Sequence, residues 1–175
     1  MCFGSQHSHD EIPASVPGKQ TSPMYLDIET SPFDFEGLRM RHYLGEDGVK
    51  LGVAIGADDG SVSLNNAPRD NFENTAEVIL QNADADKLVG ELRDSATRDS
   101  IAMPFVLKDE AAGTYISVAG DRHDVSINTR FDDASRGPSA WDTEAILTAE
   151  QAVSLADFLD SRPKPAKPLP NAAGI

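Results

Sequence analysis

Few residues of this chain could carry chemistry, and the densest group of them stands near the N-terminus. Cys2, His7, His9, Asp10 and Glu11 are all potential metal ligands. A structural zinc site needs four preorganised ligands, usually with two from another element, and the sequence has no second cluster of this kind. We therefore predict a polar tail and no metal site.

A hydrolytic triad is not indicated by the spacing of the second candidate group. His123 and Asp124 could act as a base and the residue that orients it, with Ser117 or Ser126 as the nucleophile. His123 falls in a predicted turn, however, and Ser126 follows Asp124 by two positions on an alternating strand. The three side chains are not expected to converge, and we interpret His123 and Asp124 as turn residues.

Other motifs of catalysis and ion binding are incomplete. The runs Asp58-Asp59-Gly60 and Asp84-Ala85-Asp86 have the carboxylate spacing with which calcium loops begin, but neither continues to the distal glutamate of such a loop. The chain has no glycine-rich phosphate loop, no nucleophile elbow and no His-Glu-x-x-His motif. We therefore expect no catalytic residue, no cofactor and a protein that is not an enzyme.

Trp141 is the residue best suited to recognise another protein, because tryptophan and arginine are enriched at binding hot spots. It is the only tryptophan of the chain and lies in a long predicted loop, which has a shorter counterpart earlier in the sequence. The predicted interaction residues of the two loops are Trp141, Phe131, Arg136, Arg130, Arg69 and Phe72. The alternative is that Trp141 and Phe131 close the core, since large aromatic side chains are mostly buried.

The net charge of −14 bears on the choice of partner. The 15 Lys and Arg residues are scattered among 29 Asp and Glu residues rather than gathered into a stripe. Direct binding of DNA or RNA depends on such a stripe, so we do not expect it. An acidic surface instead suits a protein partner with a basic surface, or it imitates nucleic acid.

Hydropathy and cysteine content bear on the compartment. No apolar run approaches the length of a membrane span, and the first residues lack the charged and apolar regions of a signal peptide. Cys2 is the only cysteine, which excludes an internal disulfide and fits a reducing compartment. We therefore expect a cytoplasmic protein that does not associate with membranes.

The elements that position these residues recur in two halves of the chain. Met40 aligns with Met103, and Val62-Ser63-Leu64-Asn65 aligns with Val125-Ser126-Ile127-Asn128. After one insertion, further matches are Glu77 with Glu144, Ile79-Leu80 with Ile146-Leu147, Leu88 with Leu155 and Leu92 with Leu159. Because order, spacing and side-chain type persist, we interpret Met40 to Asp160 as two tandem copies of one unit.

Each copy is predicted to hold about four antiparallel strands. The strands of the first copy are Met40 to Leu44, Leu51 to Ile55, Ser61 to Asn65 and Ala76 to Leu80. Those of the second copy are Met103 to Lys108, Tyr115 to Val118, Val125 to Thr129 and Glu144 to Leu147. Met24 to Glu29, with apolar residues at alternate positions, is predicted as a leading strand before the first copy.

A helix closes each copy. Helical spacing of i, i+3, i+4 and i+7 gives one apolar stripe in each: Ala85, Leu88, Val89 and Leu92, and then Ala152, Leu155, Ala156 and Leu159. Thr148 is a favourable N-cap, and Gln151 stands where a capping box needs its second member. The second helix is therefore predicted to begin directly after Thr148.

These elements predict an α+β fold made of two tandem strand-rich repeats. One copy alone would make a marginal core, so we expect the two to pack as a pseudo-twofold pair. The predicted boundaries are a disordered tail over residues 1–23, the first repeat with its leading strand over 24–96, the second repeat over 97–162 and a proline-rich disordered tail over 163–175.

The segment from Ala145 to Leu159, AILTAEQAVSLADFL, resembles part of a known group of proteins. Small uncharacterised proteins from actinobacteria and their phages end in a similar strand and a helix with a Leu-Thr, Glu, Ala, Leu-Ala, Leu pattern. Such families often carry paired N-terminal cysteines with a histidine, whereas only Cys2, His7 and His9 stand in that region here. The resemblance implies an origin rather than an activity.

From the duplicated scaffold, the unequal loops and the missing catalytic motifs, we expect a non-enzymatic protein-interaction module. It would bind another protein through its long loops, as an inhibitor or accessory protein. Two alternatives remain open from the sequence. One is an acidic nucleic-acid mimic that blocks a DNA- or RNA-binding protein, and the other is a nucleotide or small-molecule sensor or hydrolase with a pocket between the repeats.

Overall fold

The computed structural model describes residues 23–30, 48–68, 76–132 and 143–163 of the chain. The predictions for most of both tails, for the strand Met40 to Leu44 and for the ligand types Cys2, His7 and His9 concern residues outside these ranges.

The first unit is a four-stranded antiparallel sheet followed by a helix, as predicted. Strands that follow one another in the sequence are also neighbours in the sheet. Leu51, Val53 and Ile55 are buried while Gly52 and Ala54 between them are only partly buried, because successive side chains of a strand face opposite sides. The elements are β1 (Met24–Glu29), β2 (Val49–Ile55), β3 (Val62–Pro68), β4 (Glu77–Leu80) and α2 (Asn82–Ser95).

The second unit repeats this arrangement. Its four strands form a second antiparallel sheet in sequence order, and a helix follows the last of them. The elements are β5 (Phe105–Asp109), β6 (Thr114–Gly120), β7 (Asp124–Phe131), β8 (Thr143–Thr148) and α3 (Ala149–Asp160).

Strand registers and helix burial agree between the two units. Val62 pairs with Leu80 between β3 and β4, and Val125 pairs with Leu147 between β7 and β8. Each helix buries the four residues of its predicted stripe: Ala85, Leu88, Val89 and Leu92 in α2, and Ala152, Leu155, Ala156 and Leu159 in α3. The tandem copies predicted from the sequence are therefore present in the structure.

The first strand of the first copy differs from the prediction. Leu26 of β1 pairs with Val53, just as Phe105 of β5 pairs with the equivalent Val118. The strand expected to lead the repeat is thus the first strand of the repeat itself, and the alignment of Met40 with Met103 does not describe this pairing. A match of short apolar patterns does not reveal which strand bonds to β2, because pairing partners are chosen by long-range packing.

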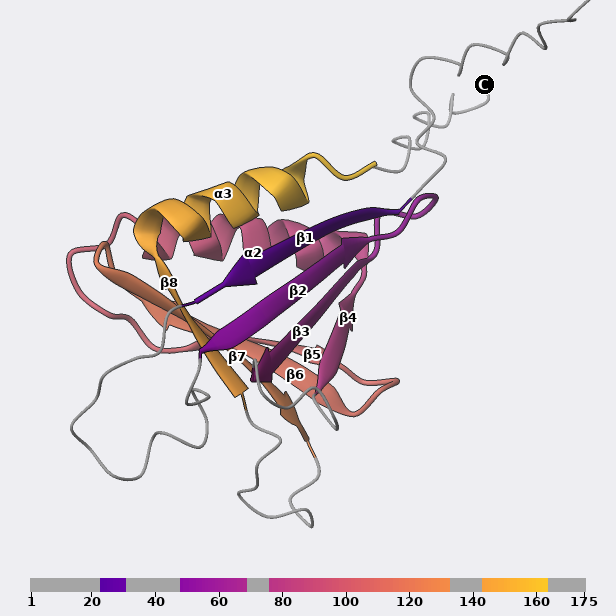
Figure 1. The fold of residues 1–175 in the computed structure, drawn as a ribbon, viewed down its shortest axis with the longest axis horizontal. Coiled ribbons are helices and arrows are strands. Elements are labelled where there is room, and N and C mark those ends of the chain that lie inside the picture. The colour runs from indigo at the N-terminus through magenta and orange to yellow at the C-terminus, as the bar shows by residue number, and fades with distance from the viewer. Residues whose placement is uncertain (1–22, 31–47, 69–75, 133–142, 164–175) are drawn as a thin grey trace, which may run out of the picture.

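The two sheets pack against each other through their inner faces, and the helices lie side by side along one side of them (Figure 1). β3 contacts β7 and β8, while β4 contacts β5 and β6. The inner side chains of both sheets and both helical stripes form a single hydrophobic cluster. Each half therefore supplies part of the core of the other, which explains why a unit of this size does not need a core of its own.

Local sequence sets the start of α3. The Thr148 hydroxyl accepts a hydrogen bond from the Gln151 backbone N–H at 3.2 Å, and the Gln151 side chain accepts one from the Thr148 N–H at 3.0 Å. The predicted capping box is therefore confirmed. α2 begins after Gln81, whose side chain makes no capping hydrogen bond.

The end of the second unit is fastened to the first unit. The Arg162 side chain is fully buried and donates to the Asn82 side chain at 2.9 Å and to the Asn82 carbonyl at 3.1 Å, and it also pairs with Asp86. Gly60, in the turn between β2 and β3, adopts a φ of +68°, and a Cβ there would lie 2.2 Å from the Pro163 carbonyl oxygen. The turn therefore requires glycine for both its conformation and its contact.

Two further contacts join the halves. The Arg93 guanidinium of α2 lies 3.0 Å from Asp157 and 3.4 Å from Asp160 of α3. Where the sheets meet, the buried Asn66 side chain donates to the Ile127 carbonyl at 2.8 Å. Neither helix in the described part of the chain is long and apolar enough to cross a membrane.

Candidate binding surfaces

Two of the six predicted interaction residues belong to the described part of the chain. Arg130 and Phe131 end β7. Arg130 is exposed and its Nε donates to the Asn128 side chain at 2.8 Å, whereas Phe131 is partly buried. The others, Trp141, Arg136, Arg69 and Phe72, lie outside the described residues. The structure thus places the strand ends from which both predicted loops begin, at Pro68 and at Phe131.

The outer faces of the two sheets carry the same residues at five equivalent positions. These pairs, which we call the shared outer-face set, are Ala54 and Ala119, Ser63 and Ser126, Asn65 and Asn128, Glu77 and Glu144, and Ile79 and Ile146. By contrast, the outward positions of β1 and β5 differ: Asp27 corresponds to Val106, and Glu29 to Lys108. The identity is therefore concentrated on β3 and β4 and on β7 and β8, with one residue each from β2 and β6.

The serine and the glutamate of the shared outer-face set are arranged alike in both copies, whereas Asn65 is partly buried and Asn128 is buried. The Ser63 hydroxyl donates to the Glu77 carboxylate at 2.5 Å, and the Ser126 hydroxyl donates to the Glu144 carboxylate in the same way. Glu77 stands directly opposite Asn65 on the neighbouring strand, as Glu144 stands opposite Asn128. Ile79 beside this group is 43% exposed. Each face thus presents fixed hydrogen-bonding groups next to an apolar side chain, which is the chemistry of recognition.

These residues could be aligned from the sequence, but the sequence did not indicate that they form a surface. Ser63 and Asn65 fit the solvent-facing side of a strand, and such a side is ordinary in an antiparallel sheet. The signal that could have found them is the repeat itself. Burial explains why core positions keep apolar residues, but it does not explain why outward positions keep the same polar ones.

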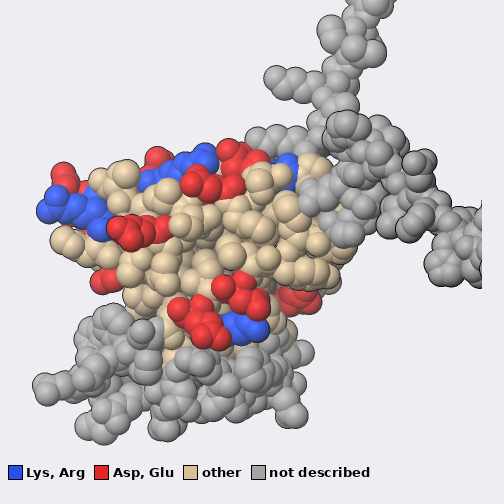
Figure 2. Space-filling model, turned by 45° about the horizontal axis from the view of Figure 1, so that its top comes forward, with Lys and Arg blue, Asp and Glu red and all other residues tan. Residues whose placement is uncertain are grey.

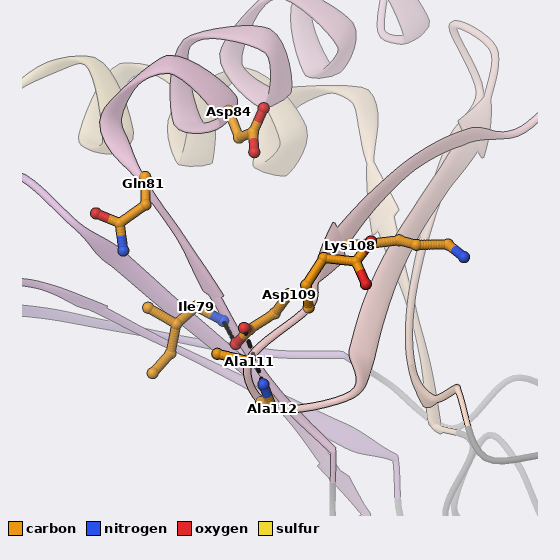
Figure 3. A pocket seen from close by; sticks show the side chains of 8 residues that line it. Ile79, Gln81, Asp84, Lys108, Asp109, Ala111 and Ala112 are labelled. Atoms are coloured by element: carbon orange, nitrogen blue, oxygen red, sulfur yellow. Dashed lines mark hydrogen bonds between the residues drawn. The ribbon is translucent and has the colours of Figure 1, made fainter.

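A hollow of about 510 Å³ lies where the first unit meets the second, beside the edge of β4 (Figure 3). The carboxylate of the buried Asp109 accepts hydrogen bonds from the Ile79 N–H at 3.0 Å and from the Ala112 N–H at 3.1 Å. The Thr114 hydroxyl donates to the Glu77 carbonyl at 2.6 Å. Side chains of the second unit therefore bond peptide groups of the β4 edge. We call this contact the β4–β5 clasp.

A second hollow, of about 570 Å³, occupies the equivalent place beside β1. We call it the β1–α3 groove. It is lined by Leu26, Asp27, Ile28 and Glu29 of β1 and by Thr148, Glu150, Gln151 and Ser154 at the start of α3. Like the first hollow, it lies between the two units, which is where one of the alternatives from the sequence expected a pocket.

The β2–β3 turn and the β6–β7 turn use aspartate to hold the backbone. The Asp59 carboxylate accepts a hydrogen bond from the Ser61 N–H at 3.0 Å, and the Asp121 carboxylate accepts one from the His123 N–H at 2.8 Å. These bonds favour the ionised form, so they hold the pKa of both carboxyls below the usual value. His123 thus has the turn role expected from the sequence. Among the described residues, no group of three or more Asp, Glu, His or Cys is placed to hold a metal ion.

No known family model matches this chain, and no curated protein matches it either. The geometry of the surfaces is therefore the basis for any functional proposal.

Proposed function

We propose that this chain is a non-enzymatic interaction protein that binds another protein through the two copies of the shared outer-face set and the segments that continue from β3 and β7. The observation that carries the proposal is the retention of the same outward residues in both copies, concentrated on β3, β4, β7 and β8. A cross-strand pair contributes only about 0.2 to 1 kcal/mol to a sheet, so stability is a weak reason to keep Ser63, Asn65 and Glu77 together twice. A shared partner is a stronger one.

The arrangement of the sheets makes such binding bivalent. Because the sheets pack through their inner faces, their outer faces point away from each other (Figure 1). Two partner chains, one on each face, could be held without competing for the same space. When the two partner chains belong to one assembly, the second binding event becomes intramolecular and raises overall avidity without any new contact.

Charge favours this proposal over a nucleic-acid mimic. A mimic needs a row of acidic groups spaced like phosphates. On the face shown in Figure 2, Lys and Arg instead stand among Asp and Glu along the helices. Arg93 there lies between Asp157 and Asp160, and Lys87 lies 3.0 Å from Asp84. These pairs partly neutralise the acidic groups that a mimic would have to present.

Charge also weighs against a nucleotide site between the repeats. The hollow beside the β4–β5 clasp is lined by Asp84, Asp109 and Glu110. In Figure 3 the ammonium of Lys108 points away from the Asp109 carboxylate. Lys108 instead lies 3.6 Å from Asp132. A phosphate entering this hollow would meet like charge, which disfavours binding.

The test is affinity capture from lysate of the native host, with variants of the chain in which a glutamate of each outer face is changed to lysine. Tagged wild-type chain would be compared with Glu77→Lys, Glu144→Lys and the double variant, and captured proteins would be quantified by mass spectrometry. We expect one partner whose recovery falls with either single variant and is lost with both. Asp94→Lys is the matched control, because it reverses an exposed acid near the end of α2, away from both faces.

Capture of the same partners at unchanged yield by the double variant would contradict the proposal. The contribution of the two predicted loops is tested in the same assay with Trp141→Ala, Arg136→Ala, Arg69→Ala and Phe72→Ala. Recovery of the partner should fall with changes in either loop if the segments after β3 and β7 extend the two faces.

A further inference from the structure

The two places where the units meet are built on the same plan but are closed differently. Where the second unit has Asp109 and Thr114, which form the β4–β5 clasp, the first unit has Thr30 and Val49. The Thr30 hydroxyl is engaged with its neighbour, donating to the Val49 carbonyl at 3.2 Å and accepting from the Val49 N–H at 3.3 Å. The valine side chain has no hydrogen-bonding atom. Thr30 and Val49 of the first unit therefore do not form a clasp like the one that Asp109 and Thr114 form in the second unit.

β1 is consequently an edge strand with a groove beside it. In the described part of the chain, β1 pairs with β2 on one side and with no strand on the other. Thr30 donates its N–H to Val49, and in an antiparallel ladder hydrogen-bonded pairs alternate with non-bonded ones. The peptide groups of Tyr25 and Asp27 therefore point away from β2, toward the open side. An exposed edge of this kind is a template for an added strand.

The lining of the β1–α3 groove favours a cationic occupant. Asp27, Glu29 and Glu150 contribute three carboxylates, and Lys50 lies 3.0 Å from Asp27. Leu26 adds a partly exposed apolar side chain. Alternation along β1 places Asp27 and Glu29 on one side of the sheet and Leu26 on the other, so every second side chain of a bound strand would lie beside these two carboxylates and the others beside Leu26.

We infer that the β1–α3 groove binds an extended segment of a partner protein in which Lys or Arg alternates with apolar residues, and that this segment adds to the first sheet as a strand beside β1. The inference rests on the proposed function only in that the occupant is a protein. It concerns a surface separate from the shared outer-face set, so either can fail without the other.

The experiment measures fluorescence anisotropy of labelled ten-residue peptides with the wild-type chain. A peptide that alternates lysine with valine should bind, and one that alternates glutamate with valine should not. Raising the salt concentration should weaken the binding of the lysine peptide, because its contacts with exposed carboxylates are screened. Equal binding of the two peptides, or no binding of the lysine peptide at millimolar concentration, would overturn the inference.

Backbone methylation separates strand addition from attraction by charge alone. Two lysine–valine peptides of the same charge would carry N-methyl groups on alternate residues, one set on each edge of the strand. Strand addition uses one edge, so one methylated peptide should lose binding and the other should retain it. Equal affinity of both methylated peptides would exclude a strand added to β1.

Charge reversal on the protein locates the site. Glu150→Lys should weaken the lysine–valine peptide about fivefold to tenfold, the size expected for reversing one exposed charge beside a cationic ligand. Asp84→Lys reverses an acid of the equivalent hollow, where the β4–β5 clasp bonds the strand edge, and should leave the affinity unchanged. A loss of affinity with Asp84→Lys and none with Glu150→Lys would place the peptide in the wrong hollow and reject the assignment.

Discussion

At the scale of single residues, this fold depends on small features at its turns. Asp59 in the β2–β3 turn and Asp121 in the β6–β7 turn hold the backbone by the same kind of bond, although the two loops differ in sequence. Position 60 requires glycine, because the residue there has a positive φ and the Pro163 carbonyl leaves no room for a Cβ. Each feature gives a prediction that involves one atom or one proton.

Ionised turn aspartates make stability depend on pH in the acidic range. The pKa values of Asp59 and Asp121 are lower in the folded chain than in the unfolded one, so the stabilisation is present above the unfolded pKa and is lost as the pH falls through the folded value. The double variant Asp59→Asn, Asp121→Asn should show a smaller loss of stability below about pH 4 than the wild type. Urea unfolding at several pH values measures this, and an unchanged pH profile would contradict it.

Alanine substitutions at three glycines distinguish the energetic cost of a positive φ from that of a steric clash. Gly60→Ala should destabilise the chain by more than about 2 kcal/mol, because the new Cβ clashes with the Pro163 carbonyl in addition to adopting a positive φ. Gly113→Ala shares the positive φ, 66°, but its Cβ meets nothing within 4 Å, so about 1 kcal/mol is expected. Gly90→Ala, in the open middle of α2, should stabilise by about 0.5 to 1 kcal/mol. Equal effects of the first two variants on urea midpoints would show that the Pro163 contact is unimportant.

At the scale of elements, the helices were the most predictable part. Their stripes contain every fourth or third residue of a short segment, and the Thr148 and Gln151 capping box is a local signal, so distant residues are not needed to recognise them. The first strand was assigned differently because Met40 and Leu44 resemble Met103 and Leu107 in type and spacing. Only pairing with β2, a contact between separate segments, identifies β1 as the equivalent of β5.

The candidate surfaces were predictable only in part for the same reason. The polar residues of β3 and β7 could be aligned from the sequence, but the β4–β5 clasp joins Asp109 to Ile79 across two units, and no local pattern announces it. The β1–α3 groove likewise combines Asp27 with Glu150, which are far apart in the chain. Four of the six interaction residues predicted from loop composition remain predictions, since they lie outside the described residues.

The two arginines that join the units should differ in their contribution to stability. The Arg162 side chain is completely buried, and its loss removes the donor to the Asn82 side chain and to the Asn82 carbonyl, so Arg162→Ala should cost about 3 kcal/mol. Arg93, whose side chain is 44% exposed, should cost less than about 1 kcal/mol when changed to alanine, because exposed ion pairs are weak and screened. Chemical denaturation of both variants provides the comparison. Equal losses would show that the buried contact does not fasten the second unit to the first.

At the scale of the whole molecule, duplication has consequences for both folding and binding. One hydrophobic cluster includes residues from both units, so the halves stabilise each other. The packing that buries the inner faces also leaves two outer faces that share the same residues at five positions and are directed to opposite sides. The two places where the units meet differ: the β4–β5 clasp bonds the edge of β4, whereas among the described residues the edge of β1 is open at the β1–α3 groove. The two units thus share five outward residues but differ at the strand edges where they meet.

The stoichiometry of the captured complex tests the central claim most directly. Native mass spectrometry of the chain titrated with its captured partner should show two partner chains bound at saturation, and one bound to either Glu77→Lys or Glu144→Lys. Saturation at a single partner chain, unaffected by either substitution, would contradict the claim that the two outer faces are equivalent binding surfaces.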